Sequence, residues 1–184
     1  MSSPYETYVE MKEFVSFNEA DIQNLISLRD IFARHGRGIT DRFYANLGTN
    51  PATAAQIEGR VEALKATHGV WMMELFSGEY GEAYFERRKR IGEAHVRIGL
   101  PPQFVEGVMS AIRGEGEVAI HAEIADKAEA NAKVRSLMKI LDLDLIVINL
   151  AYSEERIELM CKITGMRRNL IENLIKQGQK KKQG

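Results

Sequence analysis

Apolar residues recur along most of this chain at spacings of three and four, the period of an α-helix that packs on one side. Runs rich in valine, isoleucine and threonine that alternate with polar residues, as in strands, are absent. Each of the four prolines (Pro4, Pro51, Pro101 and Pro102) stands where a helix can start, and none interrupts a long periodic segment. The pattern predicts an all-α fold.

Glycine and proline separate the periodic segments and suggest where helices begin and end. A weakly amphipathic stretch covers residues 5–14, and the first clear helix begins after Asn18, a good N-cap, and is expected to end at Gly36. Further helices are expected over residues 40–47, 51–76, 82–98 and 101–124, and from Lys127 onward.

The segment that begins near Lys127 is apolar on several faces, which is typical of a helix buried on several sides. It is either a central core helix or a helix that packs both on its own core and on a partner subunit. From Ser153 the pattern loosens but keeps helical spacing. We therefore expect one domain over residues 1–155, and over 156–184 a helical linker or tail toward a possible output module. The alternative for this tail is a terminal helix that transmits nothing.

Composition narrows the class of protein. The 184 residues suffice for one domain, and a net charge of −1 gives no basic footprint for nucleic acid. No apolar run approaches the roughly 20 residues that span a bilayer, and the N-terminus lacks the apolar segment of a secretory signal. The single cysteine, Cys161, excludes an internal disulfide, a covalently attached c-type haem and zinc sites built on paired cysteines. A cytoplasmic protein is expected.

Two of the four histidines lie on apolar stripes of adjacent expected helices. His68 belongs to the third periodic segment and His95 to the fourth. A single histidine on an apolar face is more often a hydrogen-bonded core residue than a ligand. Iron coordination is attractive because neutral imidazole binds iron well, and because it resolves the cost of burying a polar ring. Periodicity alone does not distinguish a haem pocket from a plain helical core.

Other chemistry is sparse in the sequence. We find no H-E-x-x-H zinc motif, no Gly-rich phosphate loop and no legible nucleophile–base motif. His35 and His121 are expected to be solvated. The basic run Arg87-Arg88-Lys89-Arg90 is either a solvated face or the source of a salt bridge to a haem propionate.

One run is more specific. Ile91-Gly92-Glu93-Ala94-His95-Val96-Arg97-Ile98-Gly99-Leu100-Pro101 resembles the proximal helix of the globin-coupled sensors and protoglobins, where the histidine of this pattern ligates haem iron. Leu75-Phe76-Ser77-Gly78 resembles the turn before that helix, and Arg42-Phe43-Tyr44 resembles the helix with the family's distal tyrosine. The resemblance covers roughly residues 15–155.

The resemblance implies a globin fold with an extra N-terminal segment, non-covalent haem b, and homodimerisation through the last two helices. His95 becomes the proximal iron ligand, and Tyr44 the residue that hydrogen-bonds to a bound diatomic gas, unless it is an ordinary core tyrosine. His68 is less usual, and its place on the distal stripe makes it a candidate sixth iron ligand. The residues expected to line the haem pocket are Tyr44, Leu64, Trp71, Met72, Leu75, Ile91, Ile98, Phe104 and Ile148.

The function implied is a haem-based sensor of redox state or of oxygen, carbon monoxide or nitric oxide, and not an enzyme. The output would be an appended domain or a separate partner. The alternative is a haem enzyme, such as a nitric oxide dioxygenase or a peroxidase-like globin. A third possibility is a helical interaction module without haem, against which the proximal pattern argues.

Overall fold

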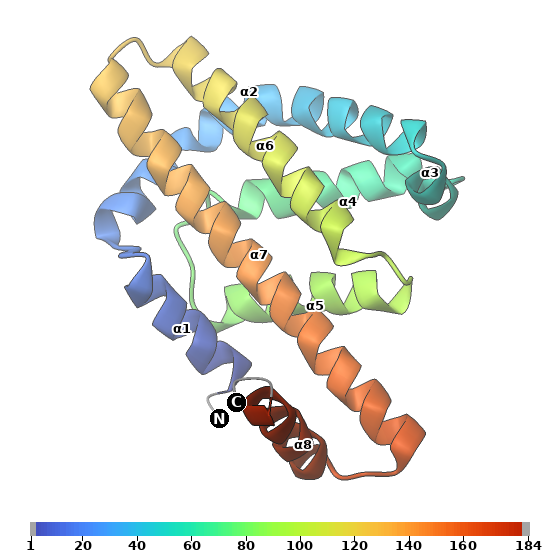
Figure 1. Cartoon of the computed structure of the whole chain (residues 1–184). Coiled ribbons are helices and arrows are strands. Elements are labelled where there is room, and N and C mark those ends of the chain that lie inside the picture. The colour runs from blue at the N-terminus through green and yellow to red at the C-terminus, as the bar shows by residue number, and fades with distance from the viewer. Residues whose placement is uncertain (1–2, 182–184) are drawn as a thin grey trace.

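A computed structural model describes residues 3–181, and every regular element in this range is an α-helix (Figure 1). The all-α prediction is confirmed. The helices over these residues are α1 (Pro4–Phe14), α2 (Glu19–Thr49), α3 (Pro51–Ile57), α4 (Val61–Glu74), α5 (Glu82–Arg97), α6 (Pro102–Glu123), α7 (Lys127–Thr164) and α8 (Arg168–Lys181).

Helix α7 is the centre of the fold (Figure 1). It contacts α1, α2, α5, α6 and α8, which explains why its sequence is apolar on several faces. Leu137, Ile140, Leu141, Leu143 and Val147 of this helix are fully buried. Packing on its own core, which both explanations for this segment share, is confirmed, and packing on a partner subunit stays a prediction.

Helix α2 is longer than the sequence suggested, and Gly36 does not end it. The segments expected on either side of this glycine are one continuous helix that reaches Thr49. The helix begins as expected at Asn18, whose side chain accepts a hydrogen bond from the Ala20 amide. Gly36 is needed for close packing, because a Cβ at this position would lie 2.9 Å from the Met72 sulfur of α4.

The segment expected as one helix over residues 51–76 is instead two. Helix α3 ends at Ile57 and α4 begins at Val61. Gly59 stands between them with φ of +70°, a conformation that no helix contains and that glycine adopts at little cost. Helix α4 ends at Glu74, close to the expected position, and α5 and α6 follow within the predicted bounds.

The chain reverses direction after α7. Helix α8 folds back beside the end of α7 (Figure 1). Ile171 is buried in this contact, and Arg168 forms an ion pair of 2.6 Å with Glu154. Helix α7 continues unbroken past residue 155, where the sequence suggested a boundary. Within residues 3–181, no helix has both the length and the apolar character that crossing a membrane requires.

Candidate functional site

An apolar cavity of about 200 Å³ lies between α4 and α5, with further walls from α2, α3, α6 and α7. Both histidines predicted as iron ligands line it, His68 from α4 and His95 from the last turn of α5. Two imidazoles from different helices therefore meet in one largely apolar space.

Most of the residues predicted to line a pocket do line this cavity. They are Tyr44, Leu64, Trp71, Ile91, Ile98, Phe104 and Ile148. Met72 and Leu75 do not. Met72 faces α2, where its sulfur lies against Gly36, and Leu75 is fully buried where its carbonyl accepts a hydrogen bond of 2.7 Å from the Tyr80 hydroxyl. Both lie on the same helix face as His68, four and seven residues after it, which is why periodicity predicted them. Their contacts with Gly36 and with the Tyr80 hydroxyl place them outside the cavity.

Sequence reasoning missed other apolar lining residues, which are Phe43, Leu47, Ile57, Leu100, Val105, Val108 and Met109. A signal was present for some of them. Leu47 lies three residues after Tyr44, and Val108 lies four after Phe104, so each shares a helix face with a predicted lining residue. Ile57 and Leu100 lie at helix ends, where periodicity carries little information.

One ring nitrogen of His68 has a hydrogen-bond partner among the described residues, and the other has none. Its Nδ1 shares a hydrogen bond of 2.9 Å with the Thr40 hydroxyl of α2, and its ring packs between Phe43 and Trp71, with centroids 5.3 and 5.0 Å away. Its Nε2 is buried without a hydrogen-bond partner among the described residues. Burial lowers the pKa of His68 to about 4, so the ring is neutral at pH 7.

His95 has the same character. Its Nδ1 is buried, and residues 3–181 give it no hydrogen-bond partner. Burial lowers the pKa of His95 below its ordinary value, which favours the neutral ring. Neutral imidazole is the form that binds a metal.

These features fit haem. A buried polar atom without a partner costs free energy, and iron coordination supplies the missing partner. Within the part of the chain that the structure describes, no three His, Cys, Asp or Glu side chains gather into a site for a bare metal ion. Two buried imidazoles that line one apolar cavity fit a haem, whose iron binds imidazole nitrogen.

Tyr44 also faces this cavity, with its ring 6.1 Å from the ring of His68 and nearly perpendicular to it. The side chain is buried, and burial raises its pKa to about 12. The phenol therefore keeps its proton at neutral pH and can act as a hydrogen-bond donor.

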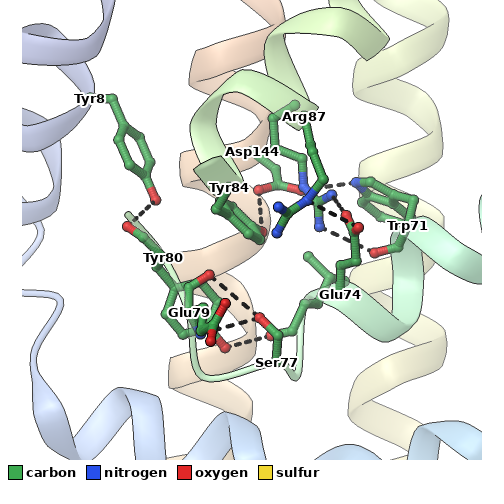
Figure 2. A network of polar contacts seen from close by, with 11 residues as sticks. Tyr8, Trp71, Glu74, Ser77, Glu79, Tyr80, Tyr84, Arg87 and Asp144 are labelled. Carbon is green, nitrogen blue, oxygen red and sulfur yellow. Dashed lines mark hydrogen bonds and ion pairs between the residues drawn. The ribbon is translucent and has the colours of Figure 1, made fainter. Parts of the chain in front are cut away.

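Behind the cavity wall, Trp71 joins a buried ionic network (Figure 2). The Trp71 indole N–H donates to Asp144 of α7 at 2.9 Å, Arg88 of α5 donates to the same carboxylate at 2.8 Å, and Tyr84 donates to its other oxygen at 2.6 Å. Arg88 also pairs with Glu74 and donates to the Trp71 carbonyl at 3.2 Å. The network thus joins α4, α5 and α7.

This network changes the interpretation of the basic run on α5. Arg88 and Asp144 have side chains with no exposed area, so Arg88 is not part of a solvated face. Arg87 forms an ion pair of 3.0 Å with Glu74. Both arginines are committed to protein carboxylates. Among the described residues that line the cavity, the one arginine or lysine is Arg60, which lies just before α4.

The remaining histidines are outside the cavity. His121 is exposed, as expected. His35 is partly exposed and pairs with Glu123 at 2.8 Å, so it is less solvated than the sequence suggested.

Comparisons with known proteins give the same family that the motif around His95 resembles. The chain matches the protein family described as Protoglobin over residues 5–158, a range that includes every residue lining the cavity. Among solved structures it is similar to the globin domain of a globin-coupled sensor from Geobacter sulfurreducens, with 30% sequence identity and a TM-score of 0.74. That match covers 78% of this chain and 95% of the other.

Proposed function

This chain belongs to the protoglobin family, and from this premise we propose that it is a haem-based sensor of a diatomic gas or of redox state. It binds haem b without a covalent bond, with His95 as the proximal iron ligand and His68 as the distal one. The physiological signal is oxygen, carbon monoxide, nitric oxide or the oxidation state of the iron.

The observation that carries this proposal is the pair of buried imidazole nitrogens without hydrogen-bond partners, on two residues that line one apolar cavity from α4 and α5. A haem-free helical core would gain nothing from leaving both groups unsatisfied. Haem supplies an iron with two axial positions, one for a protein ligand and one for a second ligand or a gas.

Other cavity residues would contact the bound gas, form the apolar walls and pair with a haem propionate. In this proposal the neutral Tyr44 hydroxyl donates a hydrogen bond to a bound gas, which is supported by its position in the cavity lining. Trp71, Leu64, Ile91 and Phe104 provide apolar walls. Arg60 is the basic side chain available for a propionate, the role that the sequence suggested for the run on α5.

Occupation of the iron by His68 would make gas binding conditional. A gas must compete with His68, so the apparent affinity falls by the fraction of molecules in which the site is open; for about 1% open, the loss is roughly 100-fold. Displacement of His68 changes the contacts of α4, which is the structural change available for signalling.

The route out of the site runs through Trp71 to Asp144 on α7, and along α7 to α8. Apolar side chains remain exposed beyond residue 158, on the end of α7 and on α8, and include Leu159, Met160, Ile163, Leu170 and Leu174. We propose that this end of the molecule forms a homodimer contact and that residues 156–184 connect the sensor to its output. The similarity to a sensor domain supports this function over an enzymatic one.

The test is an absorbance spectrum of the haem-reconstituted chain in ferric and ferrous states, for wild type, His68→Ala and His95→Ala. His121→Ala, which changes an exposed histidine away from the cavity, is the matched control. We expect sharp, split visible bands in the ferrous wild type and the control, their loss in His68→Ala, and weak or absent haem retention in His95→Ala.

Two other outcomes have defined meanings. A five-coordinate ferrous spectrum that His68→Ala leaves unchanged would remove His68 from the iron and make Tyr44 the principal distal residue. Failure of the wild type to take up haem would refute the proposed function as a whole.

A further inference from the structure

Thr40 is the hydrogen-bond partner of the distal histidine. It lies in the middle of α2, is 4% exposed, and its hydroxyl lies 2.9 Å from His68 Nδ1. The sequence placed Thr40 at the start of a short helix and gave it no role.

The choice of a hydroxyl has a chemical consequence. Neutral imidazole carries one proton, on Nδ1 or on Nε2, and the hydrogen bond made by one nitrogen selects the state of the other. A carbonyl or carboxylate only accepts, so it fixes the proton on the nitrogen that faces it. A threonine hydroxyl both donates and accepts, and it can therefore pair with either tautomer of His68.

The two tautomers of His68 present different chemical groups to the cavity. With the proton on Nδ1, Thr40 accepts the hydrogen bond and Nε2 presents a lone pair that can bind iron. With the proton on Nε2, Thr40 donates to Nδ1 and the cavity contains an N–H that can donate to a bound gas. Contacts with Phe43 and Trp71 restrain rotation of the ring, so that Nε2 is the nitrogen on the cavity side in both cases.

We propose that Thr40 is a positioning residue that allows His68 to alternate between these tautomers, as an iron ligand without gas and as a hydrogen-bond donor once gas has bound. This proposal rests on the proposed function. The exchange moves one proton from Nδ1 to Nε2 through solvent and leaves the net charge unchanged.

A second hollow, of about 690 Å³, supports this exchange. It lies between α2 and α4, and Thr40 lines it together with Asp41 and Lys65. His68 lines the first cavity and not this one. Thr40 thus stands between the distal histidine and a space that can hold water, which gives the proton that leaves Nδ1 a route to solvent. The proton that Nε2 takes up arrives from the side of the first cavity, which His68 lines.

The tautomer can be read directly. Both the ferrous gas-free six-coordinate form and the ferrous carbon monoxide complex are diamagnetic, so ring ¹⁵N shifts of His68 can be measured by NMR on the haem-loaded full chain. We expect the proton on Nδ1 in the gas-free protein and on Nε2 with carbon monoxide. The same tautomer in both states would overturn the proposal, without any variant being needed.

Variants test the part played by Thr40. Thr40→Val keeps the shape and removes the hydroxyl, and Thr40→Ser restores a hydroxyl. Thr49→Val, on the same helix, removes a hydroxyl that donates to the Asn46 carbonyl at 2.7 Å and is the control. Loss of the hydrogen bond behind a metal-binding histidine weakens the metal bond about 10-fold or more. Carbon monoxide association should therefore be about tenfold faster in Thr40→Val, with Thr40→Ser and Thr49→Val close to wild type.

Association rates in Thr40→Val within about twofold of wild type would refute the role of Thr40, since the expected loss is about tenfold. A five-coordinate wild type would also refute it, but would leave haem binding by His95 intact. Failure of every chain to bind haem would instead refute the proposed function. Circular dichroism and the haem absorbance of each variant show whether it has folded.

Discussion

Trp71 and Asp144 connect the wall of the cavity to the centre of the longest helix. The indole N–H of Trp71 donates to the Asp144 carboxylate across 2.9 Å, and both side chains are buried. The same carboxylate is paired with Arg88 of α5. The helices that carry the two candidate iron ligands are therefore joined through one residue of α7.

The first prediction concerns this buried pair. Asp144→Leu should lower the free energy of unfolding by about 3–5 kcal/mol, because it leaves the Arg88 guanidinium buried with a single remaining carboxylate partner, Glu74. The double variant Arg88→Met with Asp144→Leu should recover much of this loss, since no isolated charge remains. Urea unfolding followed by circular dichroism measures both. A double variant no more stable than Asp144→Leu would contradict the explanation.

The second prediction concerns the crossing of α5 and α7. A Cβ on Gly92 would lie 2.7 Å from the Cβ of Ala151 and 3.1 Å from the Ile148 carbonyl oxygen. Gly92→Ala should therefore destabilise the protein by about 1–2 kcal/mol through overpacking, although alanine is the better helix former. The cost should be smaller in an Ala151→Gly background, measured as a double-mutant cycle. If Gly92→Ala costs the same stability in both backgrounds, then the side chains at positions 92 and 151 do not clash.

The third prediction is a pH dependence at the start of α2. Burial of Asp21 disfavours its charged form, but hydrogen bonds from Lys139, Ser136 and the Asn18 amide outweigh this and lower its pKa. A carboxyl whose pKa is lower in the folded protein stabilises it above the ordinary aspartate pKa of about 4, and this stability is lost as the pH falls through the folded value.

Asp21→Asn should accordingly cost about 2 kcal/mol at pH 7, the loss expected for charged hydrogen bonds. The difference from wild type should stay constant down to about pH 4 and shrink below it. Chemical unfolding at a series of pH values measures the difference. A cost that is the same at pH 3 as at pH 7 would rule out the charge of Asp21 as its source.

The fourth prediction separates two candidate partners for a haem propionate. Arg60 lines the cavity, whereas Arg90 is an exposed member of the basic run on α5. Arg60→Ala should speed haem loss to an acceptor apoprotein by up to about fivefold, the effect of one exposed ion pair of at most about 1 kcal/mol. Arg90→Ala should leave the rate unchanged. Faster haem loss in Arg90→Ala than in Arg60→Ala would instead identify the basic run on α5 as the partner of the propionate.

The sequence was most informative where periodicity and a specific motif agreed. The apolar stripes placed His68 and His95 on adjacent expected helices, and both line one cavity in the structure. Most helix ends were predicted because proline or a capping side chain marks them. Gly36 was misleading, because a glycine that lets two helices approach looks the same in sequence as a glycine that ends one.

The polar part of the site was harder to predict. Asp144 interrupts an apolar run and Arg88 stands on an apolar stripe, and these two anomalies were the available signal for the buried pair. Their partnership depends on a contact between residues 56 positions apart, which no local pattern reports. Thr40 gave no signal, because a threonine within a helix becomes informative only when the side chain facing it is known.

Helix α7 also has a mechanical property. It contains neither glycine nor proline over its 38 residues, and it meets α5 at Ile148 and Ala151, well before its end at Thr164. The part beyond Ile148 is about 24 Å long at 1.5 Å per residue. A tilt of only about 5° at this fulcrum would swing the far tip by about 2 Å. A small tilt where α7 crosses α5 thus becomes a larger displacement at the C-terminal end of the helix.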